Sequence, residues 1–340
     1  MTQTELKVVE THDPAMAKVV LINGGSTGLG LAMAQDFARR GHTVVVSSHN
    51  PENLAFAGRR MAELGYEVEA EQCDCRDRDQ VVDLVRRVQE RHGRIDVLVN
   101  CAGIIKVGPV DSLVLSDFED AMATMYWGMV YATLEVLPLM QARGAGRIVN
   151  ITSIGGVMSV PHLLPYSAAK AAAIGFSKGL GSELSGTGVS VLTVVPGLMR
   201  TGSFLNARFT GQEAKEFGWF TMLSSLPGVS VSAESSARRI VRAALGSESL
   251  LTLSLPANVA ARAQGTMPGT VVKLLGLQNR LMPKPEGLPG FDLQGRQIDS
   301  GVNGSLVKKL SYFGYKAAAK LQRPKSDGEN RSERIEQAGG

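Results

Sequence analysis

Several absences limit what this 340-residue chain can be. Aromatic residues make up only 5% of it, and its basic residues are scattered among acidic ones, so the net charge of +4 does not indicate the clustered cations and stacking platforms of a nucleic-acid interface. No run approaches the roughly 18 uninterrupted apolar residues of a membrane-spanning helix. Residues 1–17 lack the basic start and apolar centre of a secretory signal. We therefore expect a cytoplasmic protein without a nucleic-acid partner.

Cysteine is also scarce. The three cysteines are Cys73, Cys75 and Cys101, and the first two would point to opposite sides of an extended segment. No histidine or cysteine lies at a spacing typical of a metal site. We expect neither a disulfide nor a bound metal, and a reducing compartment fits this composition.

The chain does contain a regular alternation of short β-branched runs and helical stretches between residues 18 and 255. The runs lack polar alternation, which is typical of parallel strands covered on both faces. Predicted strands lie at 19–22, 43–46, 66–72, 95–99, 147–151, 189–195 and 250–253. Predicted helices lie at 28–40, 51–64, 77–91, 116–140, 165–185 and 233–245. This order predicts an α/β fold with a doubly wound, parallel, seven-stranded sheet.

Four segments follow from this pattern: an N-terminal arm over 1–17, the sheet domain over 18–255, an amphipathic helical extension over 256–290, and a polar, partly disordered tail over 291–340. Short helices are expected at 257–264 and 268–282, and another at 305–321, with disorder from residue 324. The amphipathic stretch can lie on a membrane surface. Packing onto the domain or onto a partner subunit is commoner, and we favour it.

Tyr166 and Lys170 lie four residues apart in a predicted helix, and Ser153 lies thirteen residues before the tyrosine. Residues four apart share one helix face, so the ammonium can favour the phenolate. A free phenol titrates near pH ~10, and a neighbouring cation is a simple way to make it a usable acid near neutrality. Alone, the pair also fits a solvated lysine beside a half-buried tyrosine.

A glycine-rich turn stands between the first predicted strand and helix. Gly24, Gly28 and Gly30 allow the backbone to approach a pyrophosphate, while the helix N-terminus supplies N–H donors. Asn100-Cys101-Ala102-Gly103 follows the fourth strand. These positions predict dinucleotide binding over a plain tight turn.

The end of the second strand lacks the acidic residue that would bind ribose hydroxyls and select NAD. Hydroxyl, imidazole and amide groups stand there instead, at Ser48, His49 and Asn50, with Arg39 and Arg40 expected near. We therefore favour NADP(H) over NAD(H), although a solvated turn explains the same residues. Asp74, after the third strand, can accept from an adenine amine or cap a helix.

Five motifs, in this order and spacing, resemble the short-chain dehydrogenase/reductase family. They are Gly24-Gly-Ser-Thr-Gly-Leu-Gly30, Asn100-Cys-Ala-Gly103, Ile151-Thr-Ser153, Tyr166-Ser-Ala-Ala-Lys170 and Val195-Pro-Gly-Leu-Met-Arg-Thr201. The resemblance covers about 18–255. It implies a Rossmann-type fold, an NAD(P)(H)-dependent interconversion of a carbonyl and an alcohol, and a homo-oligomer formed through the helices at 116–140 and 165–185.

The resemblance also implies roles for individual residues. Ser153 would hold the substrate oxygen, Tyr166 would donate the proton in reduction, and Lys170 would bind the nicotinamide ribose and lower the pKa of Tyr166. The implied cofactor-binding set is Gly24, Ser26, Thr27, Gly28, Leu29, Gly30, Ser48, His49, Asn50, Asp74, Asn100, Ala102, Gly103, Tyr166, Lys170, Pro196, Gly197 and Thr201.

Met125 departs from the family pattern, which has an asparagine there that helps to hold a water beside the catalytic lysine. A thioether cannot donate that hydrogen bond. The proton relay is then supplied differently, runs slowly or is abandoned, or Met125 simply packs against the cofactor side of the core. A second hypothesis follows: a dinucleotide-binding regulator or scaffold with weakened catalysis.

Two further features border the expected site. His162 can reach the substrate cleft as a second donor, or serve only to shape it. Residues 202–227 carry aromatic side chains that suit an apolar lid over a lipophilic substrate, and a subunit contact or simple core fits as well. We therefore expect an oxidoreductase acting on a lipophilic small molecule; an epimerase or dehydratase with the same Tyr/Lys chemistry is less favoured.

Overall fold

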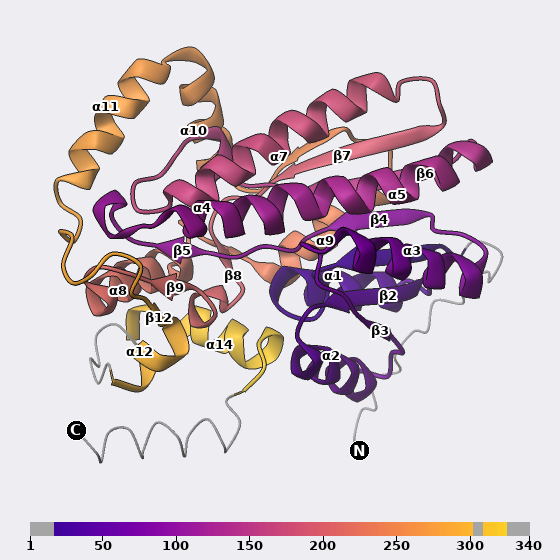
Figure 1. Cartoon of the computed structure of the whole chain (residues 1–340), viewed down its shortest axis with the longest axis horizontal. Helices are drawn as coiled ribbons and strands as arrows, with labels where there is room; N and C mark the ends of the chain where they lie inside the picture. The colour runs from indigo at the N-terminus through magenta and orange to yellow at the C-terminus, as the bar shows by residue number, and fades with distance from the viewer. Residues whose placement is uncertain (1–16, 302–308, 325–340) are drawn as a thin grey trace, which may run out of the picture.

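Seven parallel strands form the central sheet of the computed structural model, which describes residues 17–301 and 309–324 (Figure 1). The strands are β1 (Val19–Asn23), β2 (Thr43–Ser48), β3 (Glu69–Gln72), β4 (Val97–Asn100), β6 (Gly146–Ile151), β7 (Val189–Val195) and β11 (Leu250–Thr252). Their order across the sheet is β11-β7-β6-β4-β1-β2-β3. The predicted doubly wound sheet is confirmed, and its topological switch point lies between β1 and β4.

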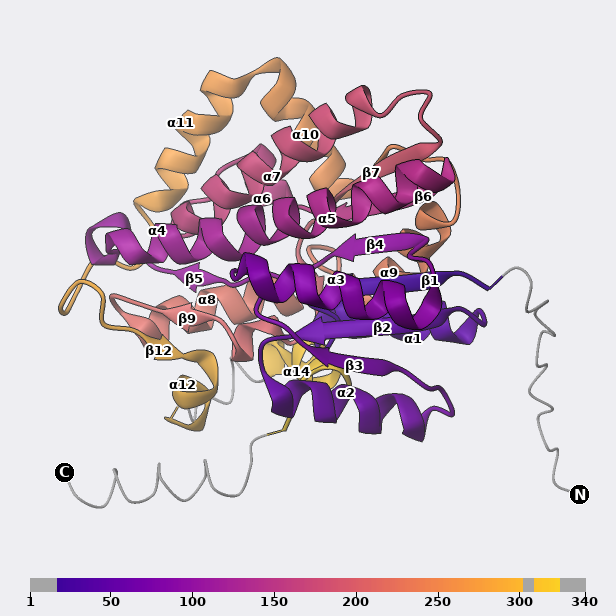
Figure 2. The same cartoon turned by 45° about the vertical axis from the view of Figure 1, so that its right-hand side comes forward.

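Helices cover both faces of the sheet (Figure 2). One face carries α1 (Gly28–Arg39), α2 (Pro51–Glu63) and α9 (Ala233–Ala244); the other carries α3 (Arg78–His92), α5 (Gly128–Arg143) and α7 (Leu164–Glu183). The helix expected at 116–140 is interrupted: α4 (Leu115–Met122) leads into a π-helical turn over Ala123–Trp127 before α5 begins.

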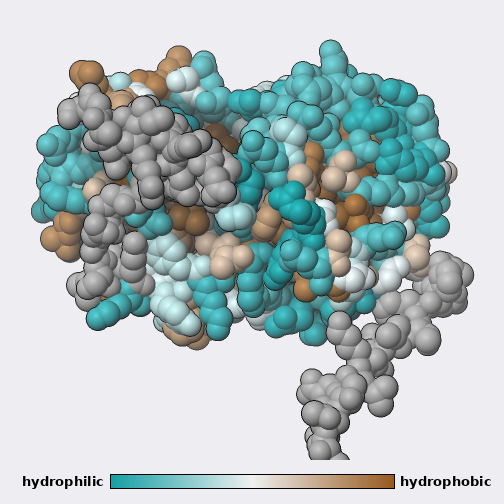
Figure 3. Space-filling model, turned by 90° about the horizontal axis from the view of Figure 1, so that it is seen from below, coloured by the Kyte–Doolittle hydropathy of each residue, from teal (hydrophilic) through white to brown (hydrophobic). Residues whose placement is uncertain are grey.

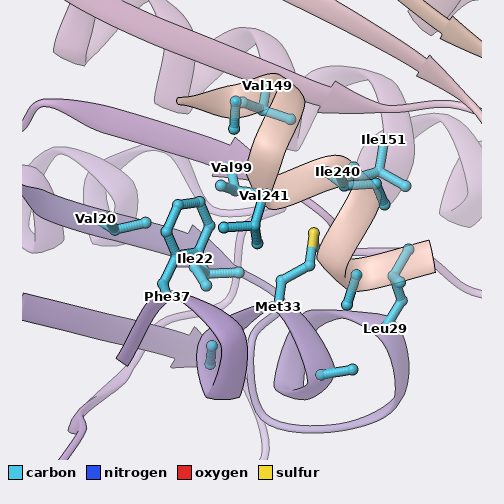
Figure 4. Close-up of a cluster of buried hydrophobic side chains, with 14 of the residues drawn as sticks. Val20, Ile22, Leu29, Met33, Phe37, Val99, Val149, Ile151, Ile240 and Val241 are labelled. Carbon is cyan, nitrogen blue, oxygen red and sulfur yellow. The ribbon is translucent and has the colours of Figure 1, made fainter. Parts of the chain in front are cut away.

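The core between the sheet and its first helical face explains why these strands are apolar throughout. Phe37 and Met33 of α1 lie between the valine-rich strands and Ile240 of α9 (Figure 4), and all three side chains are fully buried. Because both faces of each central strand are covered, these strands do not alternate polar and apolar residues. This packing fixes the carboxyl ends of β1 and β4 side by side, where α/β sheets bind ligands.

Small elements that were not expected from the sequence surround this edge. They are α6 (Ile154–Val157), α8 (Glu213–Ser225), β5 (Lys106–Val107), β8 (Met199–Arg200), β9 (Arg208–Phe209), β10 (Val231–Ser232), β12 (Leu293–Gln294), and single 3-10 turns at Val110–Ser112 and Ser203–Leu205. Phe204, Phe209 and Phe217 are buried together in this layer. These phenylalanines of the segment 202–227 therefore form a small core of their own.

The expected helical extension is present as α10 (Leu255–Thr266) and α11 (Pro268–Asn279). The two helices form an arm beside the domain in both views (Figures 1 and 2). α10 contacts α6, as the preference for packing onto the domain requires. α11 does not follow it: Val271 is its only buried residue, and Leu274 and Leu277 are 61% and 57% exposed.

The described residues beyond Phe291 pack back onto the domain. β12 joins a small sheet with β9, and α12 (Gly295–Gly301) and α14 (Tyr312–Leu321) lie beside α8.

The face of the molecule that is seen from below is mainly hydrophilic, with small apolar patches (Figure 3). Apart from residues 17 and 324, the expected arm over residues 1–17 and the expected disorder from residue 324 lie outside the described residues.

Across residues 17–301 and 309–324, none of the helices has both the length and the apolar character that crossing a bilayer requires.

Candidate active site

The glycine turn is built by close contacts that only glycine permits. Gly24 has φ +83°, and a Cβ there would lie 2.5 Å from the backbone nitrogen of Ala102. A Cβ on Gly30 would lie 2.1 Å from the carbonyl oxygen of Gly24. The turn after β1 and the Asn100–Gly103 segment after β4 therefore meet, as the motifs predict.

The first turn of α1 suits a phosphate. Its N-cap residue, Thr27, makes no side-chain capping hydrogen bond, and no acidic residue lies in that turn. The first N–H groups of a helix lack intrahelical partners and carry partial positive charge. The residues present thus fit the diphosphate of a dinucleotide, held by the backbone of Gly28, Leu29 and Gly30.

Ser153, Tyr166 and Lys170 come together at the carboxyl end of β6. The hydroxyl of Ser153 hydrogen-bonds the hydroxyl of Tyr166 and accepts from the backbone N–H of Gly155 at 3.0 Å. Lys170 Nζ donates to the carbonyl of Ile151 at 2.7 Å and lies 6.0 Å from the centre of the Tyr166 ring. Two hydroxyls and an ammonium are thereby gathered beside the switch point of the sheet.

Burial dominates the electrostatics of this group. It raises the pKa of Tyr166, and the hydrogen bond from Ser153 only partly opposes it. Burial also lowers the pKa of Lys170 to about 8. Desolvation thus disfavours both the phenolate of Tyr166 and the ammonium of Lys170 in this structure. That Lys170 lowers the pKa of Tyr166, as the family resemblance implies, stays a prediction.

The segment after β7 completes the edge. The carbonyl of Pro196 accepts from Ile154 at 2.8 Å, and Gly197 is confined by Ser254, whose Oγ would lie 2.7 Å from a Cβ at that position. The buried Thr201 lies so near the glycine turn that a Cβ on Gly28 would be 3.9 Å from its Cβ. Three predicted segments thus lie near one another at this edge of the sheet.

Comparison with known proteins agrees with this arrangement. Residues 18–210 match the family model for short chain dehydrogenase. This chain belongs to the short-chain dehydrogenase family.

Individual relatives have the same fold. A 3-oxoacyl-(acyl-carrier-protein) reductase of Synechocystis is 38% identical over 188 residues, which are 54% of this chain and 75% of the relative. A short-chain dehydrogenase structure from Streptomyces avermitilis superposes with a TM-score of 0.65 at 30% identity, covering 78% of this chain and 98% of that one. A structure of an actinorhodin polyketide ketoreductase variant with NADPH gives a TM-score of 0.61 at 30% identity, covering 71% and 97%.

Met125 sits in the π-helical turn of this short-chain dehydrogenase and is 1% exposed. It packs with Ala121, Ala169 and the ring of Tyr166, and a Cβ on Gly103 would lie 3.6 Å from its sulfur. The interpretation that Met125 packs against the cofactor side of the core agrees with these contacts.

At the expected adenosine end, several polar groups already have partners. Ser48 Oγ accepts from the backbone N–H of Asn50 at 3.3 Å, and Asn50 caps α2 by accepting from Asn53 at 2.9 Å. The Arg76 guanidinium bonds both carboxylate oxygens of Asp74 and holds the pKa of that carboxyl below its usual value. Of the predicted phosphate ligands here, His49 is the most exposed.

Arg39 and Arg40 do not lie near this end. Both pair with Asp36, at 2.8 and 2.9 Å, in the last turns of α1. α1 runs from the carboxyl edge of the sheet back toward its amino edge, so its final residues lie at the edge remote from the glycine turn. The expectation that they approach a 2′-phosphate is wrong.

The side chain of Asn100 is also used inside the fold. Its amide donates to Thr133 and Asn150 at 3.2 and 2.9 Å, and Asn150 donates in turn to Ser177. This buried network ties β4 and β6 to α5 and α7. Asn100 therefore positions the strand end through its side-chain N–H groups, while its Oδ1 is buried without a hydrogen-bond partner.

His162 links its loop to α8 through Nδ1, so this nitrogen is not free to act as a donor to a substrate. It has φ +64°, and its Nδ1 lies 2.7 Å from Glu216 of α8, which also accepts from Trp219 at 2.6 Å. Glu216 is fully buried. No sequence pattern pointed to this carboxylate, which stands in an aromatic stretch more than fifty positions away.

Removing the Lys170 ammonium should change how stability depends on pH. The unfolded lysine has a pKa of 10.5 and the folded one about 8, so the unfolded chain binds more protons between these values and stability rises with pH across that window. The unfolding free energy of wild type relative to Lys170→Met should rise by up to about 3 kcal/mol from pH ~8 to ~10.5, measured by urea unfolding. Lys178→Met, which removes an exposed lysine of the same helix, is the control. A flat or falling difference contradicts the assignment.

Proposed function

We propose that this short-chain dehydrogenase is an NADP(H)-preferring oxidoreductase that interconverts a carbonyl and an alcohol on a lipophilic small molecule. The observation that carries the proposal is the hydrogen-bonded pair of Ser153 and Tyr166 beside Lys170, next to an uncapped helix N-terminus in a glycine turn. Hydride addition to a carbonyl creates negative charge on oxygen, and this pair presents two hydroxyl groups to one point.

Each of the three side chains has a separate role in carbonyl reduction. The dinucleotide, when bound, supplies the hydride that forms the new C–H bond. The Tyr166 O–H bond breaks and its proton passes to the substrate oxygen, which becomes the alcohol, while the Ser153 hydroxyl donates a hydrogen bond to that oxygen. The phenolate left on Tyr166 is stabilised by the Lys170 ammonium and regains a proton from water. Oxidation runs through the same groups in reverse.

The cofactor preference rests on the end of β2. Ser48 and His49 stand where an acidic residue would repel a 2′-phosphate. The related actinorhodin ketoreductase variant was solved with NADPH, which supports the same choice.

The substrate class rests on the side chains around Tyr166. Ile105, Val160, Leu205 and Trp219 are partly buried and pack, like Tyr166, against the small aromatic core. Apolar walls around a few polar groups are typical of pockets for lipophilic molecules. The name of the Synechocystis relative supports a 3-oxoacyl thioester as the first carbonyl compound to test.

We also propose that the chain acts as a homo-oligomer in the cytoplasm. Trp127, which directly precedes α5, and Leu134, within that helix, are 45% and 56% exposed, and a second copy packed along this helix would cover them. The free thiols of Cys73, Cys75 and Cys101 suit a reducing compartment.

Tyr166→Phe should abolish turnover and leave cofactor binding nearly intact. The change removes the proton donor, so NADPH-dependent reduction of an acetoacetyl thioester should fall by about two to four orders of magnitude. The NADPH dissociation constant, from fluorescence titration, should stay close to that of wild type. Tyr131→Phe, on α5, is the matched control. Wild-type turnover in the Tyr166 variant refutes the role of Tyr166.

Ser48→Asp tests the cofactor preference. A carboxylate at the end of β2 repels a 2′-phosphate and accepts from ribose hydroxyls, so NADPH should bind about tenfold more weakly, with NADH unaffected or tighter. Titration of both cofactors measures this, with Ser185→Asp, an exposed site, as the control. A variant that still prefers NADPH to the same degree argues against the assignment of this strand end.

Met125 motivates one alternative function, a dinucleotide-binding regulator with weakened catalysis. Under our proposal, Met125→Asn lowers the unfolding free energy by about 1–3 kcal/mol, because it buries an amide without partners, and kcat changes little. Steady-state kinetics and urea unfolding of the variant give both quantities. A large rise in kcat supports the weakened enzyme instead.

A further inference from the structure

Gln322 follows α14 and is 4% exposed, which is unusual for a polar side chain at the end of an expected tail. Its amide Nε2 donates to the carbonyl of Thr201 at 2.9 Å. Its Oε1 accepts from the Asn206 side chain at 2.7 Å. Both ends of this amide are thus bonded to the chain that follows β7 and leads into residues 202–227, the segment expected to border the substrate, which we call the substrate loop.

The same amide borders the glycine turn. A Cβ on Gly28 would lie 3.4 Å from Gln322 Nε2, and Gly28 is the first residue of α1. Gln322 therefore joins the two walls of the candidate cofactor site, the first turn of α1 on one side and Thr201 on the other.

Neighbouring residues hold Gln322 in this place. Leu321 is buried in the core cluster that contains Leu29. Ala318 packs so closely on the loop that a Cβ on Gly202 would lie 2.4 Å from its own. Arg323 forms an ion pair of 3.0 Å with Glu52 in the first turn of α2. The end of α14 is thereby fixed against α1, α2 and the substrate loop together.

A second set of contacts fixes the chain that leads into α14. Asp292 pairs with the buried Lys106 and accepts from Arg208 Nε at 2.7 Å. Arg296 donates to Asn206 at 3.1 Å and to the carbonyl of Arg323 at 2.6 Å. Asn206 thus links Gln322 to Arg296, so the extension and the substrate loop form one network.

Gln322 and the rest of the C-terminal extension lie outside the part of the chain that the family model covers, which ends at residue 210. The Gly28 and Thr201 walls belong to the family domain, whereas the residue between them comes from this chain's own C-terminal extension.

We propose that Gln322 is a positioning residue of the dinucleotide site, which holds the Thr201 segment against the glycine turn so that a cofactor diphosphate is bound between them. The proposal rests on the proposed function above. Gln322 Nε2 has two hydrogens, and its bond to Thr201 uses one. The other is carried by an atom that borders Gly28, and it gives the extension a donor for a phosphate oxygen.

Two substitutions separate this role from simple packing. Gln322→Met keeps the length and volume but removes both hydrogen bonds, and NADPH should bind about tenfold more weakly. Gln322→Glu also places a carboxylate beside the glycine turn, so it should weaken binding further, and the excess should shrink as salt is raised. Lys320→Met is the matched control, because this exposed lysine of the same helix pairs only with Glu234 among the described contacts and should leave binding unchanged.

The readout is the dissociation constant from protein fluorescence, measured in the full chain for NADPH and for adenosine 2′-phosphate, with a thermal unfolding scan of each variant. Adenosine 2′-phosphate lacks the diphosphate, so its affinity should stay near that of wild type in all three variants. A general loss of structure would weaken both ligands alike.

The outcomes are distinguishable. If wild type binds NADPH and the Gln322 variants bind it equally well, this inference is overturned and the proposed function still stands. Equal weakening of NADPH and adenosine 2′-phosphate, or failure of both Gln322 variants to fold, also overturns it, because the residue would then serve stability. Wild type that binds no dinucleotide overturns the proposed function itself.

Discussion

The contact between the turn after β1 and the strand end after β4 is the constraint on which the rest of the site depends. Gly24 approaches Ala102 so closely that no side chain fits between them. This contact brings the N-terminus of α1 to the switch point of the sheet, and α7 then places Tyr166 and Lys170 beside it. The valine-rich strands and the α1 core support this geometry, because they fix both strand ends in register.

Burial shapes the chemistry of the site as much as proximity does. The same low-dielectric surroundings that strengthen the hydrogen bond between Ser153 and Tyr166 also disfavour the phenolate and the ammonium. Met125 contributes to these low-dielectric surroundings, since its thioether side chain lies between Tyr166 and Gly103. The candidate reactive groups lie in the family domain, and Gln322 of the C-terminal extension bonds Thr201 at the border of the candidate cofactor site.

Much of this could be predicted from local patterns, and the misses have physical reasons. The seven strands, the glycine turn and the Tyr166/Lys170 pair are each specified by residues close in sequence, so periodicity and spacing reveal them. Asn100 and Asn50, which the sequence predicts to bind a cofactor, have structural partners that it did not reveal: their side chains bond Asn150 and the first turn of α2. A sequence shows that an amide is present and not which of several nearby partners it will reach.

The sequence by itself determined the parallel sheet, the family and the candidate reactive side chains, because strand burial and motif spacing are encoded over short distances. Only the tertiary structure decided that Glu216 binds His162, that Arg39 and Arg40 lie at the far edge, and that Gln322 reaches Thr201. The contacts of Glu216 and Gln322 join segments that are far apart in the sequence. The place of Arg39 and Arg40 follows from the direction in which α1 crosses the sheet. The contacts of His162 and Gln322 form only once the layers have packed, because packing then decides which partner lies within reach of each of these two buried side chains.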